Sequence, residues 1–235
     1  FKQKTAYEIP KRDWSSDVCS SDLAMKRVEF FEKWSALHGG AAIKGIVKWW
    51  LSISYAISRP LVFIPPSLVT GSALVFAGLY LSWVPAPLSI LFLVLTLLVD
   101  GIDGTVALLS GKVSKNGAIL DAFIDRLVEA AWAYGLIVMG ASWKLVAVGW
   151  LAAFVQEYMR ARAAGLGQSE VGIVTIAERP VRATVIFIAL VAIAVGIADQ
   201  QVIATVAAAI WSVMQVTALV TLFLSLRSRL TQSQR

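Results

Sequence analysis

The sequence predicts an all-α integral membrane protein, with six transmembrane helices preceded by an interfacial amphipathic helix. Of its 235 residues, 58% are hydrophobic and 15% are charged, and the mean hydropathy of +0.73 is far above that of soluble domains. Apolar windows long enough to cross a bilayer as helices lie at 66–84, 86–108, 117–140, 142–163, 180–198 and 202–226. These windows predict the six spans.

The basic residues predict how the spans are oriented. Only Lys144 flanks one set of window ends, and the other set has Lys26, Arg27, Lys33, Lys44, Lys48, Arg59, Lys112, Lys115, Arg160, Arg162, Arg179, Arg182, Arg227, Arg229 and Arg235. By the positive-inside rule, both termini and the loop at 109–116 are expected in the cytoplasm. The net charge of +6 then reflects orientation and attraction to anionic lipid headgroups, and no nucleic-acid partner is expected.

The first residues differ in composition from all that follows. Residues 2–23 are polar, and they back-translate into codons similar to the two constant parts of a common short-read sequencing adapter. We therefore expect residues 1–23 to be an adapter artefact and the native chain to start near Ala24 or Met25. The single cysteine, Cys19, falls in this segment, so disulfides, thiol catalysis and cysteine metal sites are not expected.

Residues 24–65 are expected to form a cytoplasmic-face segment that contains an interfacial helix. Within 41–60, helical spacing groups Ile43, Ile46, Val47, Trp50, Ile53, Ser54 and Ile57 on one face. Lys44 and Lys48 lie elsewhere on this helix, and Pro60 ends it. A short additional span is the alternative reading of this segment.

Four aspartates interrupt the second and third apolar windows. Asp100 and Asp103 are three residues apart, and Asp121 and Asp125 are four apart, so each pair lies on one face of its helix. The connection between the windows is short, which predicts antiparallel neighbouring helices and convergence of the two pairs. Four converging carboxylates repel one another unless cations lie between them.

Oxygen ligands of this kind favour Mg²⁺ or Mn²⁺, and two such ions form a site suited to phosphoryl chemistry. Gly101, Gly104 and Gly117 accompany the aspartates, and we expect backbone to approach a diphosphate at these glycines. The alternative is a set of helix-end carboxylates in ordinary salt bridges with Lys112, Lys115 and Arg126.

The aspartate region resembles the signature of the CDP-alcohol phosphatidyltransferases, D-x2-D-G-x2-A-R-x8-G-x3-D-x3-D. The matching letters are Asp100, Asp103, Gly104, Ala107, Gly117, Asp121 and Asp125. The segment "PPSLVTGSALVFAGL" is similar to the family's P-N-x-x-T opening, with Ser67 in place of asparagine. The resemblance extends over residues 41–230 and implies a six-helix phosphotransferase domain at 66–230, in a bacterial inner membrane with the active site facing the cytoplasm.

The resemblance also implies roles for individual residues. Asp100, Asp103, Asp121 and Asp125 would bind the metal ions, with Asp125 also the general base. Gly104, Ala107 and Gly117 would pack against the CDP moiety. The implied reaction is attack by an alcohol hydroxyl on the β-phosphorus of a CDP-lipid such as CDP-diacylglycerol, with release of CMP. A homodimer is left open beside a monomer.

One position departs from the signature. Leu108 stands where the family has an arginine that helps to hold the CDP diphosphate. Lys112, one helical turn further on, would supply this charge to the CDP if the helix continues. The departure favours, as an alternative function, a catalytically impaired homologue that binds CDP-lipid.

The acceptor site is predicted from the polar stretch at 156–182. Arg160, Arg179 and Arg182 are placed to hold a phosphate on the acceptor, which favours a phosphorylated polyol. "YMRARA" and "IAERPVR" resemble segments of actinobacterial phosphatidylinositol-phosphate and phosphatidylglycerol-phosphate synthases, and topological anchoring is the alternative role for these arginines. A divalent-cation transporter is a further alternative function, but it predicts acidic residues throughout the membrane depth, whereas these gather at one face.

Overall fold

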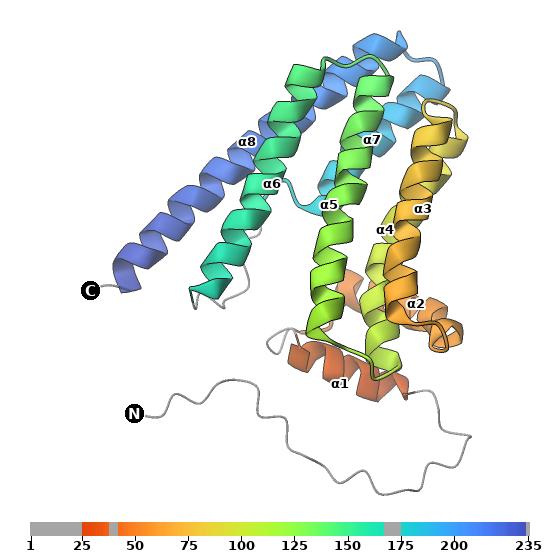
Figure 1. Cartoon of the computed structure of the whole chain (residues 1–235), viewed down its shortest axis with the longest axis vertical. Helices are drawn as coiled ribbons and strands as arrows, with labels where there is room; N and C mark the ends of the chain where they lie inside the picture. Colours follow the sequence, from red (N-terminus) through yellow and green to blue (C-terminus); the bar gives the residue numbers. More distant parts are fainter. Residues whose placement is uncertain (1–24, 38–41, 167–174, 234–235) are drawn as a thin grey trace, which may run out of the picture.

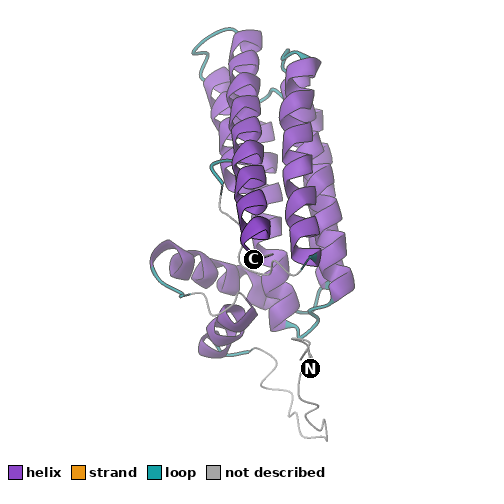
Figure 2. Ribbon diagram, turned by 90° about the vertical axis from the view of Figure 1, so that its left-hand side faces the viewer, coloured by secondary structure: helices purple, strands orange, loops and turns teal. Residues whose placement is uncertain are grey.

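A computed structural model describes residues 25–37, 42–166 and 175–233, and all regular structure within them is helical (Figures 1 and 2). The long helices are α3 (Pro66–Trp83), α4 (Leu88–Leu109), α5 (Lys115–Val138), α6 (Trp143–Gly165), α7 (Arg179–Ala194) and α8 (Gln200–Ser233). Two shorter helices, α1 (Arg27–Leu37) and α2 (Gly45–Ser58), and a 3₁₀ turn, η1 (Arg59–Leu61), precede them. The proposed adapter segment 1–23 lies outside the described residues, as does part of the acceptor stretch.

Helices α3 to α8 coincide with the six apolar windows. Within the described residues, α3, α4 and the Gln200–Arg229 part of α8 are long and apolar enough to cross a membrane. Helix α7 is shorter, at 16 residues, and α5 carries several charged side chains. The expected class, an all-α integral membrane protein, is confirmed, and the crossing of all six helices stays a prediction.

The turn between α4 and α5 makes these helices antiparallel neighbours (Figure 1). Gly111 has φ of +68°, a left-handed conformation that favours glycine, and the Lys112 N–H donates to the Ala107 carbonyl at 2.9 Å. Ser114 then begins α5, because its hydroxyl accepts a hydrogen bond from the Gly117 N–H at 3.0 Å. Both ends of the turn are thus fixed by local chemistry.

Helices α1 and α2 lie across one end of the bundle (Figure 1). Helix α2 falls within the predicted segment 41–60, and its Ser54 and Ser58 hydroxyls donate to α4 carbonyls. Helix α1 was not expected from the sequence pattern. It is held by Phe30, which is fully buried in a small cluster with Leu51, Leu108 and Leu109.

The main core lies between α3, α4, α5, α7 and α8, and α6 contributes Val146 to it. Trp132 of α5 is almost fully buried there, and its indole N–H donates to the Thr96 hydroxyl of α4 at 3.2 Å. Helix α6 packs on α8, where the Ser212 hydroxyl donates to the Leu145 carbonyl at 2.9 Å. The core cluster also includes Val99, Ile102 and Ile124, the chain neighbours of three of the aspartates, so the packed core reaches them.

Candidate active site

The structure brings the aspartates of α4 and α5 together. Carboxylate oxygens of Asp100, Asp121 and Asp125 all lie within 4.8 Å of one another. The Asp103 carboxylate is close enough to Asp100 and Asp121 for electrostatic repulsion among them. The spacing argument therefore gave the right convergence, and these groups could hold a divalent cation.

Asp103 is held from a third helix. Its side chain is buried, and its carboxylate accepts hydrogen bonds from the Thr70 hydroxyl of α3 at 2.7 Å and from the Gly104 N–H at 2.5 Å. Thr70 was not singled out as a site residue. The signal was present, because Thr70 is the threonine of the P-N-x-x-T-like segment.

Arg179, the first residue of α7, lies among the aspartates. Its Nη1 atom donates to Asp100 and, at 2.5 Å, to Asp125. The guanidinium lies over the Trp132 ring, with 5.4 Å between its Cζ atom and the ring centroid, a cation–π contact. Arg179 therefore brings positive charge to the aspartates themselves, and its binding of an acceptor phosphate stays a prediction.

The other two arginines predicted for the acceptor phosphate are paired with glutamates. Arg182 is 1% exposed, with Nη1 2.7 Å from Glu129 and Nη2 3.2 Å from Glu157. Arg160 lies 3.3 Å from Glu157 and 2.5 Å from Glu178. These glutamates were not predicted as site residues, although Glu129 and Glu157 each lie three positions from an arginine on the same helix, the spacing of helical ion pairs.

Two of the glycines have different surroundings. A Cβ at Gly101 would overlap the indole of Trp50 on α2. The surroundings of Gly101 therefore favour packing against a tryptophan over the expected close approach to a diphosphate. A Cβ at Gly104 would meet nothing within 4 Å, and this residue is exposed. Open space thus lies next to Asp103, where the CDP moiety was expected.

The remaining residues expected at the CDP lie near the α4–α5 turn. Ala107 is half-buried on α4, and Gly117 is exposed in the first turn of α5. The condition placed on Lys112 is not met, because Gly111 ends the helix and leaves Lys112 exposed in the turn. Leu108, at the position of the family arginine, is only 8% exposed and packs with Phe30 and Leu51 beneath α1 and α2.

The arrangement defines a class of protein: an integral membrane protein with four carboxylates and one guanidinium at the end of a helix bundle. The chain belongs to the CDP-alcohol phosphatidyltransferase family, whose sequence pattern matches residues 63–226. The resemblance inferred from the aspartate signature is thereby confirmed.

Two relatives are archaetidylinositol phosphate synthases. The one from Pyrococcus horikoshii is 40% identical over 93 residues, which is 38% of this chain and 48% of the relative. The one from Aeropyrum pernix is 32% identical over 108 residues, which is 46% of this chain and 54% of the relative. The chain spans about half the length of the curated relatives it matches.

Proposed function

We propose that this protein transfers a substituted phosphate group from a CDP-alcohol, such as CDP-diacylglycerol, to an alcohol acceptor with release of CMP, in phospholipid synthesis. The observation that carries the proposal is the convergence of Asp100, Asp121 and Asp125 with Asp103 at one end of the bundle. The proposed spans would put this site near the membrane surface, where a lipid-linked substrate presents its polar headgroup. Family membership supports the same reaction class.

The donor atoms fit a divalent metal ion. All four groups are carboxylates, the hard oxygen ligands that suit Mg²⁺ or Mn²⁺, and one oxygen of Asp121 is buried with no hydrogen-bond partner among the described residues. Asp100, Asp103, Asp121 and Asp125 would hold the metal, which we propose to be two ions. When bound, these ions would neutralise the diphosphate and favour departure of CMP.

The side chains then have separate tasks. Asp125 takes the proton of the acceptor hydroxyl as its oxygen bonds to the β-phosphorus and the bond from that phosphorus to the CMP oxygen breaks. Gly104, Ala107 and Gly117 form the wall for the CDP moiety, and the open space at Gly104 supports this role. Thr70 keeps Asp103 oriented through its hydrogen bond.

We propose a phosphorylated polyol as the acceptor. Arg179 carries this proposal, because its buried Nε and Nη2 atoms have no hydrogen-bond partner among the described residues, and phosphate oxygens would satisfy such donors. The names of both relatives specify an archaetidylinositol phosphate product, which favours inositol phosphate over glycerol 3-phosphate. Arg160 and Arg182 would contribute less directly to binding of the acceptor phosphate, since both form ion pairs with glutamates.

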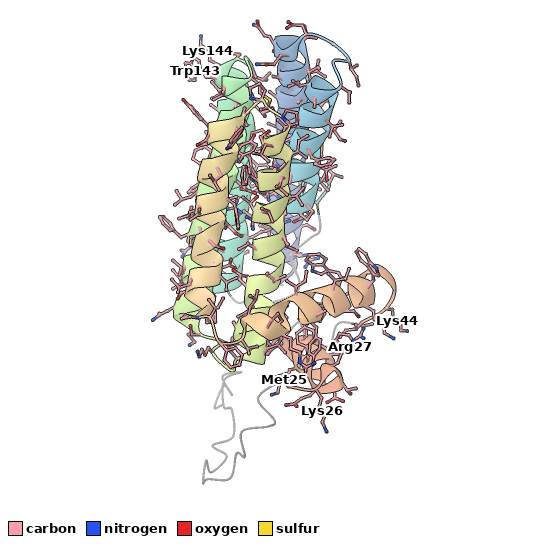
Figure 3. The ribbon with its side chains drawn as sticks, turned by 90° about the vertical axis from the view of Figure 1, so that its right-hand side faces the viewer. Met25, Lys26, Arg27, Lys44, Trp143 and Lys144 are labelled. Carbon is pink, nitrogen blue, oxygen red and sulfur yellow. The ribbon has the colours of Figure 1, made fainter. Side chains whose placement is uncertain are left out.

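For the membrane, we propose six spans, an interfacial α2 and a cytoplasmic active site in the plasma membrane. The match of six helices to six apolar windows supports the spans. Lys26, Arg27 and Lys44 lie at the end of the molecule opposite Lys144, which supports the orientation (Figure 3). We keep the proposed division into 1–23 as artefact, 24–65 as N-terminal segment and 66–230 as catalytic domain.

A substrate screen tests the function. The purified chain with Mg²⁺ is given CDP-diacylglycerol or a CDP-linked archaetidyl lipid, together with inositol phosphate, glycerol 3-phosphate, free inositol or serine, and CMP is measured. We expect CMP only with a phosphorylated polyol. CMP with serine or free inositol alone would refute the acceptor, and CDP-lipid binding without any CMP would favour the impaired homologue that Leu108 suggests.

A further inference from the structure

Two ion pairs join α5 to α7 in successive helical turns. Asp125 pairs with Arg179 at 2.5 Å, and Glu129 pairs with Arg182 at 2.7 Å. Both helices run toward the end of the bundle opposite α1, and the shorter α7 begins partway along α5 (Figure 1). Glu129 lies one turn beyond Asp125, and Arg182 lies one turn beyond Arg179, so the second pair repeats the first on the same faces.

The second pair is the buried one. The Glu129 and Arg182 side chains are each 1% exposed, whereas those of Asp125 and Arg179 are 20% and 11% exposed. Removing two charges from water is costly, and a buried ion pair is therefore weak evidence for stability alone. A pair of this kind can instead fix one packing register of two helices, because any shift leaves a buried charge without its partner.

Further ion pairs connect this second pair to the start of α7. Arg126 lies 2.7 Å from Glu129, Glu157 lies 3.2 Å from Arg182, and Arg160 joins Glu157 to Glu178. The Glu178 carboxylate also accepts hydrogen bonds from the Thr175 N–H and hydroxyl. Burial raises the pKa of Glu178, but the hydrogen bonds from Arg160 and Thr175 outweigh it and hold the pKa below its ordinary value.

The six residues Arg126, Glu129, Glu157, Arg160, Glu178 and Arg182 comprise three cations and three anions, so their formal charges cancel. They lie on α5, on α6, at Glu178 before α7 and at Arg182 in the first turn of α7, and Arg179 begins α7 between the last two. Arg179 itself contacts Asp100, Asp125 and the Trp132 ring. Its position thus depends on where the network holds the start of α7.

We propose that Glu129 and Arg182 are positioning residues, whose ion pair fixes α7 against α5 at the register in which Arg179 reaches Asp100 and Asp125. This inference rests on the proposed function, because the position of Arg179 matters for the binding of cations and phosphate at the aspartates. Arg179 opposes a divalent cation at these carboxylates, since like charges repel. Releasing Arg179 from its position should therefore tighten cation binding.

The experiment measures the Kd of Mn²⁺ for the full chain in detergent, from the electron paramagnetic resonance signal of the free ion. The variants are Arg179→Met, the double variant Glu129→Met with Arg182→Met, and the three changes combined. We expect the first two each to bind Mn²⁺ about thirtyfold tighter, which is the effect of a unit charge at about 4 Å on a divalent ion with water-like screening. The triple variant should match Arg179→Met, because the buried pair acts through Arg179.

The matched control removes the same two charges from the exposed α1 pair, Glu29→Met with Lys33→Met, and should leave Kd unchanged. If the double variant elutes as aggregate, Arg182→Lys replaces it, and its effect should likewise vanish in the Arg179→Met background. Unchanged or weaker Mn²⁺ binding in the double variant, or a triple variant whose effect is the product of the other two, would overturn the inference. A wild-type chain that binds no Mn²⁺ would overturn the proposed function and this inference with it.

Discussion

Replacing Gly101 by alanine tests how α2 meets the aspartate-bearing turn of α4. In an open helix this change would stabilise the protein by about 1 kcal/mol, because alanine has the higher helix propensity. Here the added Cβ would overlap the Trp50 ring, with Cη2 at 3.1 Å and Cε2 at 3.2 Å from it. Overpacking of this kind costs about 1–3 kcal/mol, so the net change is a loss of about 0–2 kcal/mol.

The sign should reverse when the ring is removed. In a Trp50→Leu background the overlap is gone, and Gly101→Ala should then stabilise by up to about 1 kcal/mol. Thermal unfolding of all four proteins in detergent measures the coupling, since 1 kcal/mol corresponds to a Tm shift of about 2–4 °C at this chain length. If Gly101→Ala changes stability equally in both backgrounds and raises the KM for CDP-lipid, this reasoning is refuted. That result would favour a contact between Gly101 and the diphosphate.

Three further predictions concern Leu108, Thr70 and the metal. Leu108→Arg should not raise turnover and should lower stability by about 3–5 kcal/mol, because it would put an unpaired charge beneath α1 and α2; a stable variant with higher turnover would contradict this. Thr70→Val should weaken Mn²⁺ binding by about 1.5–3 kcal/mol through loss of the hydrogen bond to Asp103, as measured by calorimetry beside a Thr217→Val control; an unchanged Kd would speak against it. Chelation should abolish CMP release and Mg²⁺ or Mn²⁺ should restore it, and full activity in chelator would exclude the metal site.

The sequence allowed the fold class and the centre of the site to be predicted for physical reasons. Helical windows are visible as apolar runs, and the spacing of Asp100, Asp103, Asp121 and Asp125 places each pair on one helix face. The short connection then forces the pairs together. Local periodicity and loop length were enough for these features, because each depends on residues that are close in the chain.

Other features depend on contacts between distant segments. Trp50 fills the space at Gly101, and no local pattern specifies that α2 crosses α4 at this point. The pairing of Arg182 with Glu129 joins two helices far apart in sequence, so neither this partner nor the burial of Arg182 was predicted. The condition placed on Lys112, a continuing helix, is not met for a local reason, since Gly111 ends the helix before it and was not weighed as a C-terminal signal.

The central claim is that Asp125 takes the acceptor proton in a metal-dependent transfer from a CDP-lipid. The decisive measurement is CMP release by Asp125→Asn beside wild type, with CDP binding followed by calorimetry in Mg²⁺. Asp199→Asn, the same change at an exposed aspartate before α8, is the control and should leave both unchanged. We expect Asp125→Asn to bind CDP within a few-fold of wild type and to lose turnover by a factor of about 10²–10⁴. A loss of turnover smaller than about tenfold would be less than that range and would contradict the claim.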